Sequence, residues 1–295
     1  MKNSFRVFVL IAGLTCALPA EAETSQGPSK DVPELAALQY LIGTFDTQVT
    51  APFRTTGKVK GEWVHGGYFL KQTWTREASE ETPEMNGTVF LTYDRSKRVY
   101  RQWSFDSTST VFESKGSWDP KKWTMTWTGG ANEGFPHAWK MTFDETLAHT
   151  WSIAIKDGDG NTVYESRGKT SPTKERQLVY RKSQLATLGL AYHSYYAKNG
   201  DSPAKKEELI EFLSIRAKDD LLTIGAIERL KKGEIVIVWN AALSKDGDAN
   251  DRYRLAWETA VTKTSALMMT GGGFVQFVTP EEFAKVKEIS TGRPK

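Results

Sequence analysis

The chain contains a single cysteine, Cys16, which falls within the first 22 residues. A disulfide needs two thiols, so none can form within one copy of the chain. Removal of the segment that carries Cys16 would also exclude thiolate catalysis and thiolate metal sites. Stability must then come from burial alone, and at 39% hydrophobic residues the chain can bury substantial cores.

An excess of charge of one sign is also missing. The 39 basic and 36 acidic residues nearly cancel, the formal net charge is +3, and no long block of one sign stands out. Proteins that bind polyanions concentrate Lys and Arg on one surface. The sequence therefore predicts no nucleic-acid partner.

Catalytic motifs are scarce. There is no Gly-x-Ser-x-Gly and no His-Glu-x-x-His, the Ser-x-x-Lys at 202–205 lacks its partner motifs, and 168–170 lacks the first glycine of a phosphate loop. Stretches that begin at Asp157 and Asp246 copy part of a calcium loop without its closing glutamate, so we expect hairpin turns there. We predict no catalytic residue, no metal site and no cofactor, and we do not expect an enzyme.

The four histidines, at 65, 137, 149 and 193, show no close metal-ligand spacing. His137 and His149 nevertheless lie on neighbouring predicted strands, so a haem or metal pocket between them is one alternative. The other is that His65 belongs to a Gly-Gly turn and the remaining histidines are surface or satisfied residues.

Residues 1–22 have the features of a secretory signal peptide. Lys2 and Arg6 precede an apolar core at 7–18, and 20–22 form a small-x-small cleavage site. We predict cleavage after Ala22, a flexible lead over 23–34, and a secreted or periplasmic protein with no stable membrane insertion. An uncleaved anchor helix is disfavoured because Pro19 and Glu21 interrupt the apolar run, and lipidation of Cys16 is disfavoured because 13–15 match a lipid-attachment box poorly.

Alternating runs on either side of Gly66-Gly67 predict a hairpin over 57–76. Similar runs, rich in aromatic and β-branched residues and separated by turn residues, recur until about residue 181. We expect strands centred on 45–49, 58–64, 69–75, 88–93, 99–105, 110–115, 123–128, 139–143, 146–155, 162–167 and 177–181. Closure into an antiparallel up-and-down barrel of about ten strands would remove exposed edges. A short helix between Asp31 and Ile42 should plug or abut this sheet.

The hydrophobic period becomes helical at Ser183. One helix should end near Asn199-Gly200, a second carries Leu209, Phe212 and Leu213, and a third spans 219–231. Strands are expected at 234–240, 252–259, 265–270 and 274–278, with a terminal helix at 280–287. The fold is thus predicted to be mainly β, with a lipocalin-like barrel over 35–182 and a small α+β domain over 183–295.

Two regions resemble known families. Residues 35–182 resemble the DUF1579 family, related to calycin or lipocalin-like barrels, in Leu38 and in the stretches 41–45, 63–70, 93–94, 116–119 and 180–182, together with Trp103. Residues 184–287 are similar to the globular part of the pseudopilin-like DUF1559 proteins of planctomycetes at 184–185, 189–193 and 272–277, with Tyr195, Pro203 and 282–283. The first resemblance implies a barrel without an agreed activity. The second implies a pilin-like domain, here without the long hydrophobic helix by which pilins assemble.

Aromatic residues are the best guide to a site. Most tryptophans fall in the barrel half, and polar residues share strand faces with them, as Gln72 does with Trp74 and Arg101 does with Trp103. A barrel of this size can hold one small ligand among such side chains, whereas a collapsed core would leave no cavity. The predicted lining comprises Trp63, Tyr68, Gln72, Trp74, Arg101, Trp103, Trp123, Trp127 and Trp139.

The leading hypothesis is a secreted, non-enzymatic protein whose barrel binds a small apolar or amphipathic ligand. One alternative is an envelope structural or interaction protein that docks an envelope partner through its pilin-like domain. A barrel enzyme acting on a lipid-like substrate is the least supported alternative, because no nucleophile and base can be paired from spacing.

Overall fold

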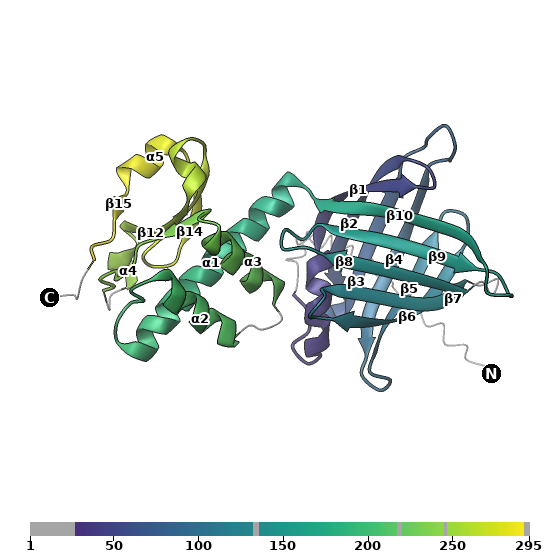
Figure 1. Cartoon of the computed structure of the whole chain (residues 1–295), viewed down its shortest axis with the longest axis horizontal. Helices are drawn as coiled ribbons and strands as arrows, with labels where there is room; N and C mark the ends of the chain where they lie inside the picture. Colours follow the sequence, from purple (N-terminus) through teal and green to yellow (C-terminus); the bar gives the residue numbers. More distant parts are fainter. Residues whose placement is uncertain (1–26, 132–135, 217–219, 245–246, 292–295) are drawn as a thin grey trace, which may run out of the picture.

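The computed structural model describes residues 27–131, 136–216, 220–244 and 247–291. Figure 1 shows a β-barrel and a smaller α+β unit joined by helix α1 (Lys174–Asn199). The predicted signal peptide, its cleavage site, Cys16 and Asp246 lie outside the described residues. Among the helices that are described, none is long and apolar enough to cross a membrane.

Within the described residues, ten strands close into a barrel, and each pairs antiparallel with its neighbours in sequence. The pairing of the first strand with the last, from Phe45 opposite Pro172 onward, completes the circle. This up-and-down order is that of a lipocalin-like barrel and confirms the predicted fold class. The strands are β1 (Gly43–Ala51), β2 (Thr55–Val64), β3 (Phe69–Arg76), β4 (Met85–Asp94), β5 (Val99–Asp106), β6 (Val111–Asp119), β7 (Thr124–Ala131), β8 (Pro136–Phe143), β9 (His149–Lys156) and β10 (Thr162–Pro172).

An aspartate begins many of the tight turns between these strands. Asp94 Oδ1, for example, accepts hydrogen bonds from the backbone N–H groups of Ser96 at 3.0 Å and Lys97 at 3.1 Å. Such side-chain bonds replace the ladder bonds that the backbone loses at a turn. The same arrangement recurs at Asp106, Asp119, Asp144 and Asp157. The stretch that begins at Asp157 is therefore a hairpin turn, as predicted.

The eleventh predicted strand, at 177–181, is wrong. These residues lie in α1, which begins at Lys174, within the range that the prediction gave to the barrel. Strand β10 ends at Pro172, and the Thr173 side chain caps the helix by accepting a hydrogen bond from Arg176 N. From this cap the helix runs without a breaker to Gly200, whose positive φ of 79° ends it as expected.

A 3-10 helix, η1 (Pro33–Leu41), closes one end of the barrel. Its Leu35, Leu38 and Leu41 are buried in the same hydrophobic cluster as the barrel interior. Polar contacts fix its position: Tyr100 donates its hydroxyl to Glu34 O at 2.8 Å, and Trp63 Nε1 donates to Gln39 Oε1 at 2.9 Å. The predicted helix before the sheet is thus present and covers the barrel end that faces α3 (Figure 1).

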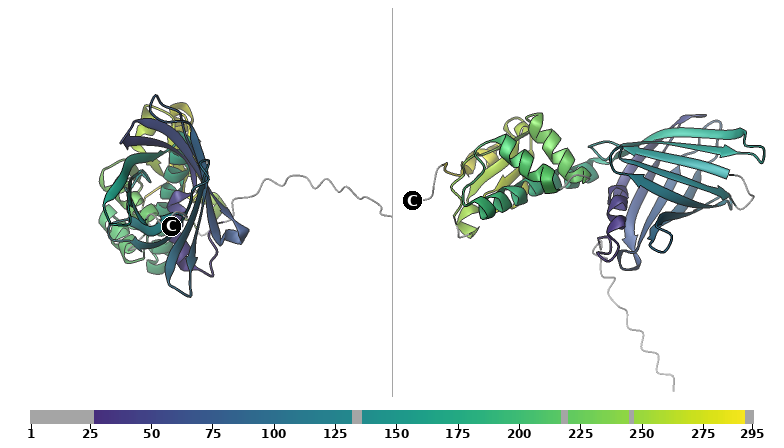
Figure 2. Two further views of the ribbon diagram at one scale, coloured as in Figure 1. Left: turned by 90° about the vertical axis from the view of Figure 1, so that its right-hand side faces the viewer. Right: turned by 60° about the horizontal axis from the view of Figure 1, so that its bottom comes forward.

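The C-terminal unit packs helices against one face of a sheet that is antiparallel except for the parallel pairing of its short last strand (Figure 2). The predicted elements are all present, although the first strand is shorter than expected. Two further short elements, α4 and β15, were not predicted. The elements after α1 are α2 (Lys206–Arg216), α3 (Leu221–Lys231), β11 (Ile235–Ile237), α4 (Gly247–Asn250), β12 (Tyr253–Glu258), η3 (Thr259–Thr262), β13 (Ala266–Thr270), β14 (Val275–Val278), α5 (Pro280–Lys285) and β15 (Lys287–Glu288).

The two units contact each other through the start of α3. Leu221 is fully buried in the barrel's hydrophobic cluster. Its N–H donates to the Tyr40 hydroxyl at 3.1 Å, and its carbonyl accepts from the Tyr180 hydroxyl at 3.0 Å. Leu221 is therefore bonded to η1 on one side and to α1 on the other.

The closing role of η1 predicts that Leu38→Ala lowers the free energy of unfolding by about 2–5 kcal/mol, because the change opens a cavity in a packed region. Urea unfolding followed by far-UV circular dichroism would measure this change. Glu34→Ala is the matched control in the same helix, since its side chain is exposed, and should stay within about 0.5 kcal/mol of the wild type. Equal midpoints for the two variants would contradict the assigned role of η1.

Candidate functional site

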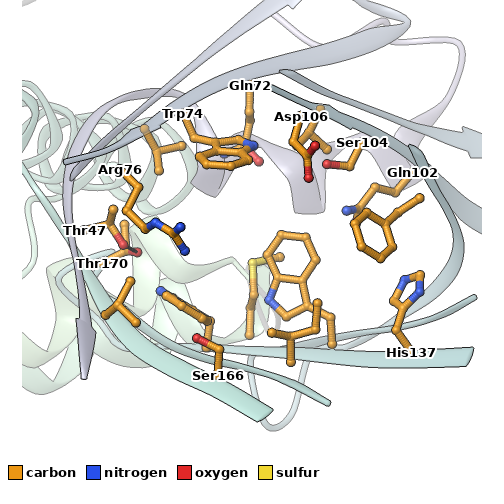
Figure 3. Close-up of a pocket in the computed structure, with 18 of the residues that line it drawn as sticks. Thr47, Gln72, Trp74, Arg76, Gln102, Ser104, Asp106, His137, Ser166 and Thr170 are labelled. Carbon is orange, nitrogen blue, oxygen red and sulfur yellow. Dashed lines mark hydrogen bonds between the residues drawn. The ribbon is translucent and has the colours of Figure 1, made fainter. Parts of the chain in front are cut away.

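The barrel is solid at one end and hollow at the other. Its interior holds a cavity of about 310 Å³ (Figure 3). Leu41 of η1 is one of the residues that line it. The lining reaches the far ends of the strands, where Arg76 ends β3 and Asp106 ends β5. Most of the wall is apolar, and it includes Trp74, Trp139 and Trp151. An apolar cavity with a few polar groups is the usual form of a small-molecule site.

Several polar atoms of the cavity lining lack hydrogen-bond partners within the described residues. They are Gln102 Oε1, Trp139 Nε1, His137 Nδ1, His149 Nδ1 and Arg76 Nε. Gln102 is only 2% exposed, so its amide cannot be satisfied by bulk water. A buried polar group without a partner costs free energy, and native proteins rarely leave one unexplained. The cavity thus combines an apolar wall with polar side chains whose hydrogen-bonding capacity is not fully used.

Arg76 and Asp106 bring opposite charges to the far end of the cavity (Figure 3). The Arg76 guanidinium lies 5.6 Å from the centre of the Phe53 ring and contacts Met85 Sδ. The Asp106 carboxylate is held by its own turn, where Oδ1 accepts from Thr108 N at 2.9 Å and Thr110 N at 3.1 Å. No ion pair among the described residues joins Arg76 to Asp106 or to another carboxylate. The guanidinium therefore remains available to an acceptor in the cavity.

His137 is paired with a buried serine. Its Nε2 lies 2.7 Å from Ser114 Oγ, and its ring meets the Phe112 ring edge to face at 5.1 Å. Burial lowers the pKa of His137, so the neutral imidazole is favoured. A hydrolytic pair would also need a group that orients the base and a nucleophile that faces the substrate. Within the described residues His137 Nδ1 has no partner, and Ser114 does not line the cavity.

His149 lies deeper, beside the rings of Phe143 at 4.8 Å and Phe45 at 6.1 Å. His137 is opposite Ile155 in the β8–β9 ladder, whereas His149 is opposite Phe143, so six residues separate the two histidines along the strands. Six residues of strand span about 20 Å, too far for both side chains to bind one ion. A shared haem or metal pocket for this pair is therefore wrong, and the described residues contain no cluster of metal-ligating side chains.

Three of the nine predicted site residues, Gln72, Trp74 and Trp139, line the cavity. Three others fill the solid end of the barrel: Trp63 and Trp127 are buried, and Trp123 packs against the same cluster from the turn before β7. The remaining three, Tyr68, Arg101 and Trp103, do not line the cavity. Tyr68 is 42% exposed and donates its hydroxyl to Asp31.

The placement of Arg101 and Trp103 inside the barrel is wrong, and strand register gives the reason. Trp103 is opposite Phe90, and Phe90 is opposite Lys71 on the next strand, so these side chains share the outer face. Arg101 stacks on Trp103 there, 5.0 Å from the ring centre, and pairs with Glu113. Alternation along one strand identifies two faces but does not say which one is inside.

Register also accounts for the cavity residues that the sequence analysis missed. Val89 is opposite both Gln72 and Ser104, so a correctly oriented β3 would have placed Ser104, Gln102 and Asp106 inside. Trp151 and His137 follow in the same way from their pairing with Met141 and Ile155. The alternation along each strand separated these residues from those of the other face. Only the register between strands shows that their face is the inner one.

Comparisons with known proteins add little to this geometry. No protein-family model matches the chain, and no curated protein matches it. Both family resemblances in the sequence therefore stay predictions. Among solved structures, Rv2717c from M. tuberculosis is similar at 13% identity and a TM-score of 0.36, over 48% of this chain and 98% of that one. A fluorescence-activating beta barrel designed de novo is similar at 13% identity and a TM-score of 0.27, over 47% of this chain and 98% of that one.

Burial of His149 predicts a pH dependence of stability. Its pKa falls from an ordinary value near 6.5 to about 4 in the folded protein. Below about pH 6.5 His149 is protonated in the unfolded chain but stays neutral in the folded protein. The folded state therefore becomes less stable as the pH falls toward 4. Between pH 7 and pH 5 the free energy of unfolding of the wild type should fall by about 2 kcal/mol more than that of His149→Gln.

Urea unfolding of both proteins at several pH values in this range would measure the difference. The other histidines are unchanged in the variant, so their contributions cancel in the comparison. Identical pH profiles for the two proteins would contradict a neutral, buried His149.

Proposed function

We propose that this protein is a secreted or periplasmic, non-enzymatic binding protein that holds a small amphipathic ligand inside its barrel. The observation that most supports this proposal is the cavity of about 310 Å³, whose apolar wall contains buried polar atoms without partners. Contact with three tryptophans would remove apolar ligand surface from water, at about 25 cal/mol per Å² buried. The Gln102 amide and the Arg76 guanidinium would orient the polar end of the ligand.

The cavity residues support binding more than catalysis. Ser114 and His137 are hydrogen-bonded, but the serine is not among the residues that line the cavity, and no carboxylate among the described residues contacts the histidine. Asp106 faces the cavity, yet its Oδ1 accepts bonds from its own turn. A barrel enzyme acting on a lipid-like substrate thus has less support than a carrier.

A second candidate function is that of an envelope interaction protein. The observation in its favour is the edge of the C-terminal sheet, where β14 pairs only with β13 among the described strands. Phe274, which precedes this strand, is 60% exposed, and Phe277, which lies in it, is 54% exposed. An unpaired strand edge with exposed aromatic side chains is a common place for another chain to add.

The carrier function predicts which tryptophan reports a bound ligand. Titration with dodecanoate, an amphipathic probe, should change the intrinsic fluorescence of the wild type. Trp139→Phe should lose part of that change because Trp139 lines the cavity, whereas Trp103→Phe should keep it because Trp103 lies on the outer face. An equal loss in both variants would show that the probe binds elsewhere.

Filling the cavity should abolish binding. Val89 lies between Gln72 and Ser104 across the neighbouring strands, so Val89→Phe would place a ring in the cavity. Its dodecanoate affinity should fall at least tenfold, about 1.4 kcal/mol, in an equilibrium dialysis assay. Thr88→Phe is the matched control, because the adjacent residue faces outward. Unchanged affinity in folded Val89→Phe would contradict a ligand in the barrel.

A further inference from the structure

A second hollow lies outside the barrel, between its closed end and the C-terminal helices. Its volume is about 630 Å³, and its lining comes from η1, α1, the start of α3 and the ends of barrel strands. Tyr40, Trp118, Tyr180 and Leu222 supply large apolar surfaces. This interdomain cleft shares no lining residue with the barrel cavity.

Arg176 brings a positive charge into the interdomain cleft. Its Nε is buried without a hydrogen-bond partner, and no hydrogen bond or ion pair of its guanidinium is found within the described chain. Arg176 is partly buried, and its Nε loses hydration without gaining an acceptor, which costs free energy. Burial also lowers the pKa of Arg176, in agreement with its geometry.

The Arg176 side chain lies directly against Gly43 of the barrel. A Cβ atom at residue 43 would lie only 2.6 Å from Arg176 Cδ and 2.9 Å from its Nε. Gly43 also has a positive φ of 98°, which other residues rarely adopt. The absence of a side chain at residue 43 therefore leaves the room that the Arg176 side chain occupies against β1.

The acidic residues of the cleft do not neutralise Arg176. Asp220 caps α3, where its carboxylate accepts from Leu222 N at 3.3 Å, Thr223 N at 3.0 Å and Thr223 Oγ1 at 2.6 Å. Glu34 is an exposed residue of η1. Neither forms an ion pair with Arg176.

We propose that the interdomain cleft binds a small organic anion. Its carboxylate or phosphate would pair with the Arg176 guanidinium, which offers parallel N–H donors to planar oxyanions. Its aromatic or aliphatic body would lie against Tyr40, Trp118 and Tyr180. Because the lining comes from both units, the bound anion would also strengthen their packing.

The test uses 1-anilinonaphthalene-8-sulfonate, a fluorescent aromatic anion, on the full chain. The titration is made in the Val89→Phe background, where the barrel is filled, so failure of the carrier function would leave this result unaffected. Adding Arg176→Gln should lower the probe's affinity at least tenfold. Lys174→Gln removes the same charge at a residue that does not line the cleft and should change the affinity less than twofold. Equal affinities for the two variants would overturn the proposal.

Competition separates the two anion chemistries. Benzoate or phenyl phosphate should displace the probe, and the more effective one identifies carboxylate or phosphate as the preferred group. Benzamide, a neutral isostere of benzoate, should not displace it. Displacement by benzamide as strong as by benzoate would overturn the proposal, as would failure of both anions.

A second measurement does not depend on the folding of a Gln variant. The Arg176 Nε–Hε signal in ¹⁵N–¹H spectra, assigned by its absence in Arg176→Lys, should shift when phenyl phosphate is added. The corresponding signal of Arg181, which is already bonded to Glu258, should not move. A stationary Arg176 signal at saturating phenyl phosphate would contradict the proposal.

Discussion

The packing of three leucines from a short 3-10 helix into one end of a closed barrel determines where this molecule is solid and where it is hollow. Leu35, Leu38 and Leu41 join the aromatic side chains of the adjacent strand ends in one continuous cluster. Beyond Leu41 no further element enters the barrel from the described chain, and a cavity remains. The same helix presents Tyr40 on its outer side, where it bonds to Leu221 and positions the C-terminal unit.

Arginine pairing distinguishes structural from available positive charge. Arg181 and Arg229 both bind Glu258, which is buried and also accepts from Leu267 N at 3.0 Å. That network ties α1 and α3 to the sheet and leaves no acceptor unpaired on Glu258. Arg76 and Arg176 differ, because each lines a hollow and neither has a carboxylate partner among the described residues. Arginines that have carboxylate partners in one place and none at the two hollows support ligand binding at those two positions.

Much of the fold could be predicted from the sequence, because turn chemistry and periodicity are local. Aspartates begin many of the turns, and Gly200 ends α1 where expected. The residues 177–181 were misassigned because their alternation suits a strand, while the cap at Thr173 that makes them helical lies upstream. The candidate site was less predictable. Gln72 and Arg101 have the same local signature, and only the register across β4 places the first inside and the second outside.

The interdomain cleft could not have been found from the sequence at all. It depends on Gly43 lying beside Arg176, residues that are far apart in the chain and meet only when β1 closes the barrel against β10. Nothing local to Arg176 marks it as different from the other basic residues of α1. Tertiary contacts alone show that it lacks a partner.

Native mass spectrometry of the protein purified from its own source would show whether the barrel carries a small molecule. A carrier should retain a bound species of small mass that is lost when the protein is denatured and that combines an apolar body with a polar end. The Val89→Phe protein, purified in the same way, should carry no such mass. A mass equal to that of the polypeptide alone, together with no affinity for amphipathic probes, would contradict the carrier function.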